Sequence, residues 1–109
     1  MDVKVISVGR IEDLGEEGYF IARRPDGNDV LVFRASGILY AVQRKCPHEA
    51  APLEKGQVWN KMIRCGQHGF TFDIETGEGL NCAGYSLLRY EVETRHEEIF
   101  IAHLPKCSK

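Results

Sequence analysis

Two short segments of the 109-residue sequence each carry one cysteine and one histidine, side chains that bind soft and borderline transition metals. The first segment is Cys46-Pro47-His48 and the second is Cys65-Gly66-Gln67-His68, and residues 49–64 separate them. Two thiolates and two imidazoles suit either a zinc ion or an iron–sulfur cluster. Structural zinc sites usually take like ligands from one segment, Cys with Cys and His with His. One Cys and one His from each segment instead favour a dinuclear centre clamped between two loops.

The residues around both segments resemble the cluster loops of the Rieske ferredoxins. The family motif is Cys-x-His followed by Cys-x-x-His, and the flanks match too: residues 46–53 read CPHEAAPL and residues 63–73 read IRCGQHGFTFD. The resemblance covers essentially the whole chain. It implies one Rieske-type 2Fe–2S cluster, with Cys46 and Cys65 as ligands of the inner iron and His48 and His68 as ligands of the outer, more exposed iron.

The net charge of such a cluster explains its chemistry. With neutral histidines, two ferric ions, two sulfides and two thiolates sum to zero, so adding an electron costs less than in a four-cysteine centre. Rieske centres accordingly have reduction potentials of about −150 to +300 mV, and they transfer single electrons. High-potential relatives carry hydroxyl side chains where this sequence has Phe70 and Phe72, and an additional cysteine in each loop that this sequence lacks. Both differences imply the low-potential, soluble class.

That class resembles the ferredoxins that serve ring-hydroxylating oxygenases. The resemblance implies a one-electron carrier, itself not an enzyme, that accepts electrons from a flavin-dependent ferredoxin reductase. It would pass them to a terminal oxygenase that acts on an aromatic compound. One alternative is the Rieske-like small subunit of an assimilatory nitrite reductase; some of these subunits have lost the cluster ligands, whereas all four are present here. The other alternative is an interaction module stapled by zinc, which would be colourless rather than red-brown.

Composition and charge limit the other functional classes. Fourteen basic and sixteen acidic residues give a net charge of −2, which excludes a generally basic nucleic-acid-binding protein. No apolar run is long enough for a transmembrane helix, and the charged residues among positions 1–30 leave no room for a secretory signal. We therefore expect a cytoplasmic monomer that contacts neither nucleic acid nor membrane. Residues 44–68 hold five basic and two acidic side chains, a local charge of +3 that is either a solvated face or a docking surface.

The remaining cysteines and histidines are expected to play no part in the cluster. Cys82 and Cys107 are expected to be thiols rather than disulfide partners, because disulfides are rare in the cytosol. His96 and His103 fall in or near the last predicted hairpin and are expected to lie on the surface.

The rest of the sequence must position the two loops, and its apolar residues mostly recur at every second position between turn signals. We predict strands at 3–8, 19–23, 30–35, 38–42, 59–64 around a turn at Asn60-Lys61, 70–74, 88–93 and 99–102, and one helical turn at 11–14. In the segment 88–93, Leu88, Tyr90 and Val92 are predicted to face the core. The charged residues that alternate with them are predicted to face solvent.

Short strands at regular spacing predict an all-β antiparallel sandwich or barrel, which is the fold that the Rieske resemblance implies. It is expected to form a single domain over residues 1–109, with a small cluster-binding subdomain at residues 44–70. Phe70 and Phe72 are expected to pack beneath the cluster, and Trp59 to pack in the core or against a loop.

Overall fold

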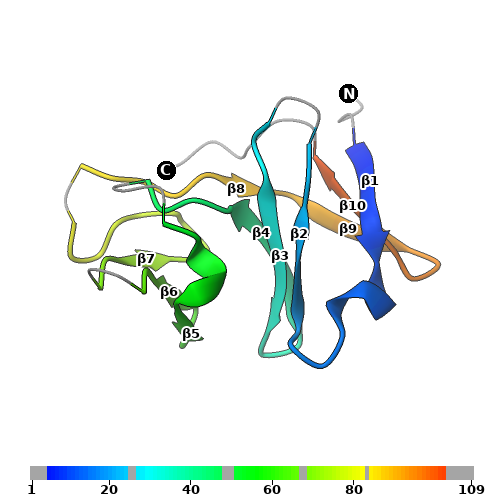
Figure 1. Ribbon diagram of the computed structural model, residues 1–109, viewed down its shortest axis with the longest axis horizontal. Coiled ribbons are helices and arrows are strands. Elements are labelled where there is room, and N and C mark those ends of the chain that lie inside the picture. Colours follow the sequence, from blue (N-terminus) through cyan, green and yellow to red (C-terminus); the bar gives the residue numbers. More distant parts are fainter. Residues whose placement is uncertain (1–4, 25–26, 48–50, 67–68, 83, 103–109) are drawn as a thin grey trace.

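The computed structural model describes residues 5–24, 27–47, 51–66, 69–82 and 84–102, and this part of the chain is nearly all antiparallel β-structure (Figure 1). The elements in chain order are β1 Val5–Arg10, the 3-10 helix η1 Ile11–Leu14, β2 Tyr19–Ala22, β3 Val30–Ala35, β4 Ile38–Gln43, the 3-10 helix η2 Leu53–Lys55, β5 Gln57–Trp59, β6 Met62–Arg64, β7 Thr71–Asp73, β8 Arg89–Tyr90, β9 Val92–Arg95 and β10 Glu98–Ala102. The predicted all-β class is confirmed, and so is the single helical turn at 11–14. The turn η2 was not predicted.

Two of the three sheets pack face to face. One has the strand order β1-β10-β9 and the other β2-β3-β4-β8. Their shared core consists of apolar side chains from both sheets: Ala22, Val30, Val32, Ala41, Tyr90, Ile99 and Ile101. Burying this apolar surface is the main force that holds the sandwich together.

Strand β3 is buried on both of its faces, because the third sheet covers the side that points away from the sandwich core. Val30 and Val32 face the sandwich core, whereas the alternating residues Leu31 and Phe33 belong to a second buried cluster. That second cluster includes residues of the third sheet, β5-β6-β7, which lies at one end of the molecule in Figure 1. The sandwich therefore serves as the platform for the third sheet.

The third sheet belongs to a segment inserted between two neighbouring strands. Strands β4 and β8 pair directly, with Ala41 opposite Tyr90, although residues 44–88 separate them in sequence. The predicted subdomain 44–70 lies within this insertion. Within it, strands β5 and β6 are joined by Asn60 and Lys61, which have φ angles of 47° and 60°. Two positive φ values are typical of the tight turns that fit the twist of a hairpin.

Gln43 joins the two ends of the insertion by hydrogen bonds. The backbone N–H of Gln43 donates to the carbonyl oxygen of Leu88 at 2.9 Å, and its side-chain Oε1 accepts from the Leu88 N–H at 2.7 Å. The Gln43 Nε2 donates to the carbonyl oxygen of Lys45 at 2.6 Å. The outgoing and returning chains are thus held together where they leave the four-stranded sheet.

The prediction of one alternating strand over 88–93 is wrong. The chain passes from one sheet to the other at Glu91, so β8 pairs with β4 and β9 pairs with β10. Leu88 is 44% exposed, whereas Arg89 is only 8% exposed, the reverse of the predicted pattern at those two positions. Simple alternation fails because both faces of this sheet are covered, and the Arg89 guanidinium donates to the backbone oxygen of Glu75 beneath the insertion.

Other differences are small. Trp59 is 39% exposed at the end of β5, which excludes the core, one of its two expected positions. His96 is exposed in the turn between β9 and β10, as predicted, whereas His103 lies outside the described residues. The described chain contains no helix of the length and apolar character needed to cross a bilayer.

Candidate metal centre

The two predicted ligand segments begin in the same way. Cys46 follows β4 and Cys65 follows β6. The backbone N–H of Cys46 donates to the carbonyl oxygen of Ala51 at 2.8 Å, and that of Cys65 donates to the carbonyl oxygen of Phe70 at 2.7 Å. Each cysteine therefore starts a loop that its own amide closes five positions later in the sequence.

Two of the four predicted ligands are described in the structure and two are not. Cys46 and Cys65 are 2% and 1% exposed and belong to the same buried cluster, and neither forms a disulfide. His48 and His68 lie outside the described residues. The structure therefore brings the two thiols into one core.

The apolar packing around the cysteines comes from both sides of the insertion. Leu53 of η2 and Ile63 of β6 are almost fully buried beside them, and Phe72 of β7 is fully buried in the same cluster. Phe70 is half-buried and packs against that cluster. The expectation that both phenylalanines are core residues is confirmed for Phe72, and Phe70 lies at the edge of the core.

Glycine backbone lies against glycine backbone where the two loops meet. A Cβ atom on Gly56 would lie 1.7 Å from the carbonyl oxygen of Arg64, and one on Gly66 would lie 2.9 Å from the carbonyl oxygen of Lys55. Gly56 has φ −93°, which any residue adopts, so contact rather than conformation demands glycine there. This close approach fixes the separation of the second loop from the chain that follows the first.

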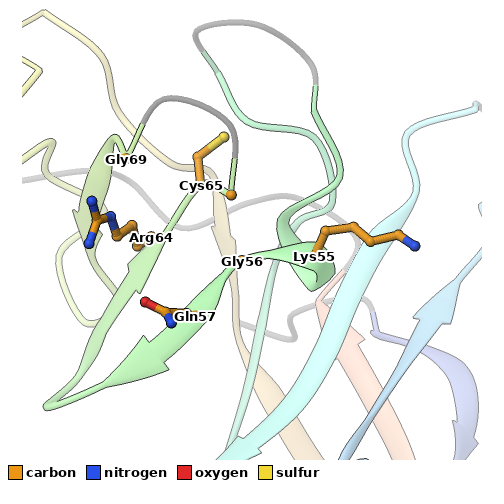
Figure 2. A pocket seen from close by; sticks show the side chains of 7 residues that line it. Lys55, Gly56, Gln57, Arg64, Cys65 and Gly69 are labelled. Atoms are coloured by element: carbon orange, nitrogen blue, oxygen red, sulfur yellow. The ribbon is translucent and has the colours of Figure 1, made fainter.

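A cavity of about 510 Å³ opens beside Cys65 at this contact (Figure 2). Its lining includes the glycine backbone and two cationic side chains, Lys55 and Arg64. In Figure 2, the Cys65 side chain points away from Gln57 and toward the loops.

An ion pair spans the first loop. Arg44 precedes the loop, and its Nη2 lies 2.8 Å from Oε2 of Glu54 in η2; Asp29 lies 3.7 Å from the same guanidinium. The side chain of Glu54 is only 7% exposed. Burial by itself would raise the pKa of Glu54, but hydrogen bonds from Arg44 and from the backbone outweigh it and hold the pKa below its ordinary value. The hydrogen bond to Glu54 in turn raises the pKa of Arg44.

The remaining cations of this region differ in their partners. Lys61 pairs with Glu75 at 3.3 Å. Among the described residues, no carboxylate lies within ion-pair distance of Lys45, Lys55 or Arg64. The positive charge predicted over 44–68 is therefore concentrated next to the two cysteine loops.

A third segment, residues 79–82, lies against the chain that leaves the second loop. The backbone N–H of Leu80 donates to the carbonyl oxygen of Thr71 at 2.8 Å, and Sγ of Cys82 lies 3.9 Å from the same oxygen. Cys82 is 7% exposed and forms no disulfide, which confirms it as a buried thiol. Cys107 lies outside the described residues. The sequence did not predict the close contact between Gly56 and Gly66 or the hydrogen bond from Leu80 to Thr71, because these contacts join different loops.

The donor set fits a 2Fe–2S cluster. Two buried thiols stand at the start of two loops of matching closure, and the sequence supplies one histidine shortly after each. A pair of thiolates and a pair of imidazoles is the ligand set of Rieske centres, in which two histidines replace two cysteines on one iron.

Comparison with protein families agrees with this reading. Residues 4–86 match the model of the Rieske [2Fe-2S] domain. The chain therefore belongs to the Rieske [2Fe-2S] domain family, and its cofactor is one 2Fe–2S cluster of the Rieske type. A Rieske cluster transfers single electrons, which is the chemistry that the resemblance of the sequence implied.

Individual relatives fall into two kinds. Apoptosis-inducing factor 3 of Homo sapiens is 36% identical over 73 residues, which are 66% of this chain but only 12% of that protein. The chain thus spans a small part of the length of that relative. The ferredoxin component of the naphthalene 1,2-dioxygenase system of Pseudomonas putida is 30% identical over 83 residues, which cover 76% of this chain and 78% of that protein.

Solved structures share the fold over nearly the whole chain. The ferredoxin of carbazole 1,9a-dioxygenase from Nocardioides aromaticivorans IC177 superposes with a TM-score of 0.76 at 27% identity, covering 91% of this chain and 97% of that one. A protein of Mycobacterium tuberculosis described as an NADH-dependent nitrite reductase small subunit superposes with a TM-score of 0.80 at 21% identity, covering 95% and 98%. At that identity the second likeness concerns the fold alone.

Proposed function

We propose that Cys46, His48, Cys65 and His68 are the four ligands of the Rieske cluster. Cys46 and Cys65 would bind the inner iron, since both thiols are buried in the core. His48 and His68 would bind the outer iron, nearer the partner that exchanges electrons with it. The observation that carries this assignment is the matching closure of the two loops by the amides of Cys46 and Cys65.

The carrier function follows from that assignment together with the relatives. We propose that the protein accepts one electron from a flavin-dependent ferredoxin reductase and delivers it to a terminal oxygenase that hydroxylates an aromatic compound. The likeness to ferredoxin components of naphthalene and carbazole dioxygenase systems supports this proposal. The protein would act as a cytoplasmic monomer, because a carrier that releases its partner in each cycle needs a small and reversible interface.

The docking face would surround the two cysteine loops. Lys45 and Arg64 each directly precede a proposed cysteine ligand, and Lys55 lines the cavity beside the second loop. All three are exposed and lack a carboxylate partner among the described residues. An acidic surface on the reductase or the oxygenase would complement them and speed the encounter.

A second candidate is the small subunit of a nitrite reductase, favoured by the fold likeness to the Mycobacterium tuberculosis protein. The two functions differ in what the protein delivers its electron to. In the first case the acceptor is a Rieske oxygenase, and in the second the protein stays bound to a large sirohaem subunit.

Co-purification from the native host tests the choice. The protein, tagged and isolated at low salt, is expected to bring down a Rieske oxygenase or its reductase, identified by mass spectrometry. The purified components, supplied with NADH and an aromatic compound, should then give a hydroxylated product that depends on this chain. Recovery of a sirohaem protein, with nitrite consumption that requires this chain, would contradict the oxygenase assignment and support the second candidate.

A further inference from the structure

The side-chain amide of Asn81 holds the chain that leaves the second cysteine loop. Its Oδ1 accepts from the backbone N–H of Thr71 at 2.9 Å, and its Nδ2 donates to the carbonyl oxygen of Gly69 at 3.0 Å. Both hydrogen bonds have ordinary length and satisfy backbone groups two residues apart. We call these two hydrogen bonds the Asn81 clasp. Gly69 directly follows His68, so the clasp holds the residues that come immediately after the proposed ligand loop.

Gly69, which the clasp holds, is also bonded to the backbone of the proposed ligand Cys65. The N–H of Gly69 donates to the carbonyl oxygen of Cys65 at 3.2 Å, while its own carbonyl oxygen accepts from Asn81 and, at 3.1 Å, from the hydroxyl of Thr71. Gly69 has φ +72°, and a Cβ there would lie 2.8 Å from Nη2 of Arg64. A hydrogen bond from each side thus fixes Gly69 in a conformation that other residues rarely adopt.

The segment that carries Asn81 is itself tied down. The N–H of Leu80 donates to Thr71, and the N–H of Gly79 donates to the carbonyl oxygen of Tyr85 at 3.2 Å. Behind Asn81, the buried Cys82 packs in the same core as Cys46 and Cys65. Asn81 itself lies at the surface, so it stabilises the second loop through its two hydrogen bonds and not through apolar burial.

We propose that Asn81 is a positioning residue for the cluster. Its hydrogen-bond partners are Gly69 and Thr71, and through them it would hold the chain that leaves the second loop in one conformation in both redox states. Backbone and side-chain groups around the metal tune a cluster through their orientation. Loss of the clasp should let the loop adopt several conformations and admit water to the cluster. This inference rests on the ligand assignment for Cys65 and His68 but on no particular partner.

The test compares three variants of the holoprotein. Asn81→Ala removes both hydrogen bonds, and Asn81→Asp keeps the acceptor for Thr71 but places a carboxylate oxygen against the Gly69 carbonyl. Leu80→Ala is the matched control, because Leu80 is the neighbouring residue and its side chain is 48% exposed. We expect N81A to broaden the electron paramagnetic resonance lines of the reduced cluster. It should also shorten the half-life of the cluster in a chelator several-fold, with N81D intermediate and L80A like the parent.

Hydrogen exchange of individual amides gives a readout that needs no partner and no turnover. In N81A the amides of Thr71 and Gly69 should exchange faster than in the parent, in both the cluster-containing and the cluster-free chain, while the amide of Val32 in the sandwich should not change. Unchanged exchange at Thr71, or line widths and cluster half-lives equal to those of L80A, would overturn the proposal. A failure of the oxygenase assignment would leave these readouts unaffected, so the two outcomes are distinguishable.

Discussion

The carboxylate of Glu54 and the guanidinium of Arg44 lie 2.8 Å apart, one on each side of the first cysteine loop. A backbone hydrogen bond joins the same two segments, because the N–H of Leu53 donates to the carbonyl oxygen of Arg44 at 2.8 Å. The base of the loop is therefore closed by two interactions, one backbone hydrogen bond and one ion pair between side chains. Because both groups are largely withdrawn from solvent, the pair should contribute more than an ordinary surface ion pair.

Replacing Glu54 tests that contribution and its pH dependence. The pKa of Glu54 lies below its ordinary value, so the pair stabilises the fold fully above the unfolded-state pKa of about 4.3. The stabilisation is lost as the pH falls through the lower, folded-state value. At pH 7, Glu54→Gln should reduce the free energy of unfolding by about 1–2 kcal/mol. The difference between variant and parent should shrink toward zero in acid, as measured by urea titration followed by circular dichroism.

The control for Glu54 is Glu12, whose carboxylate is exposed and lies 3.9 Å from Arg10. Glu12→Gln should change the free energy of unfolding by less than about 0.5 kcal/mol at any pH, as expected of an exposed pair. A Glu54→Gln variant whose deficit persisted unchanged below the pH at which Glu54 of the folded parent is protonated would mean that the side chain acts through packing rather than charge.

Adding a methyl group at Gly56 should prevent normal assembly of the cluster site. The new Cβ would meet the backbone of Arg64, which cannot move without shifting β6 and the loop that follows it. Overpacking of this kind costs about 1–3 kcal/mol, and backbone contacts are the least forgiving. Iron and acid-labile sulfide per chain, measured on freshly purified Gly56→Ala, should fall well below those of the parent.

Gly37 provides the comparison for Gly56. It has φ +78° but open space around it, so Gly37→Ala introduces backbone strain without a steric contact. That variant should lose some stability yet keep its full iron content. Equal iron content in Gly56→Ala and the parent would show that the two loops can separate without harm to the site.

Reversing the charge of Lys45 or Arg64 should slow electron transfer to the oxygenase at low salt. The effect should largely disappear at higher ionic strength, since exposed charges are screened within about 10 Å at 0.1 M salt. Stopped-flow reduction of the partner measures this. Arg44, which the sequence places in the same basic segment, is paired with Glu54 and Asp29, so its reversal should lower stability instead. Arg34, exposed on β3, supplies a matched charge reversal away from the loops; a similar slowing there would argue against local steering.

The reduction potential should lie near the lower end of the Rieske range, at about −150 mV. Phe70 and Phe72 offer no hydroxyl to the cluster sulfurs, so fewer donors stabilise the added negative charge. Phe70 lies at the edge of the core, and Phe70→Ser should raise the potential if its hydroxyl reaches a sulfur. His68→Cys should lower it by adding a thiolate. Protein-film voltammetry checks all three, and a parent value above about +100 mV would place the protein in the high-potential class.

Features that depend on a local sequence pattern could be predicted, whereas features that depend on contacts in the folded structure could not. The two Cys/His segments and the all-β class were predictable, because ligand chemistry and period-two alternation are local signals. The break at Glu91 was not, since it arises from the packing of two sheets and the alternation of Leu88 and Arg89 misleads there. The close contact at Gly56 and the clasp of Asn81 were likewise invisible, because each joins positions that are distant in sequence.

Gln43 ties the outgoing and returning chains at one point, through its backbone N–H, its Oε1 and its Nε2. The chain between that residue and Leu88 therefore leaves and rejoins the sandwich at one place, one residue beyond the pairing of Val42 with Arg89, and it packs on Leu31 and Phe33 of β3. Insertions or deletions in the intervening chain would leave the register of β4 and β8 unchanged. The cluster-bearing segment can thus change in length and surface within this host, but transfer to another pair of adjacent antiparallel strands would also require the apolar face that Leu31 and Phe33 supply.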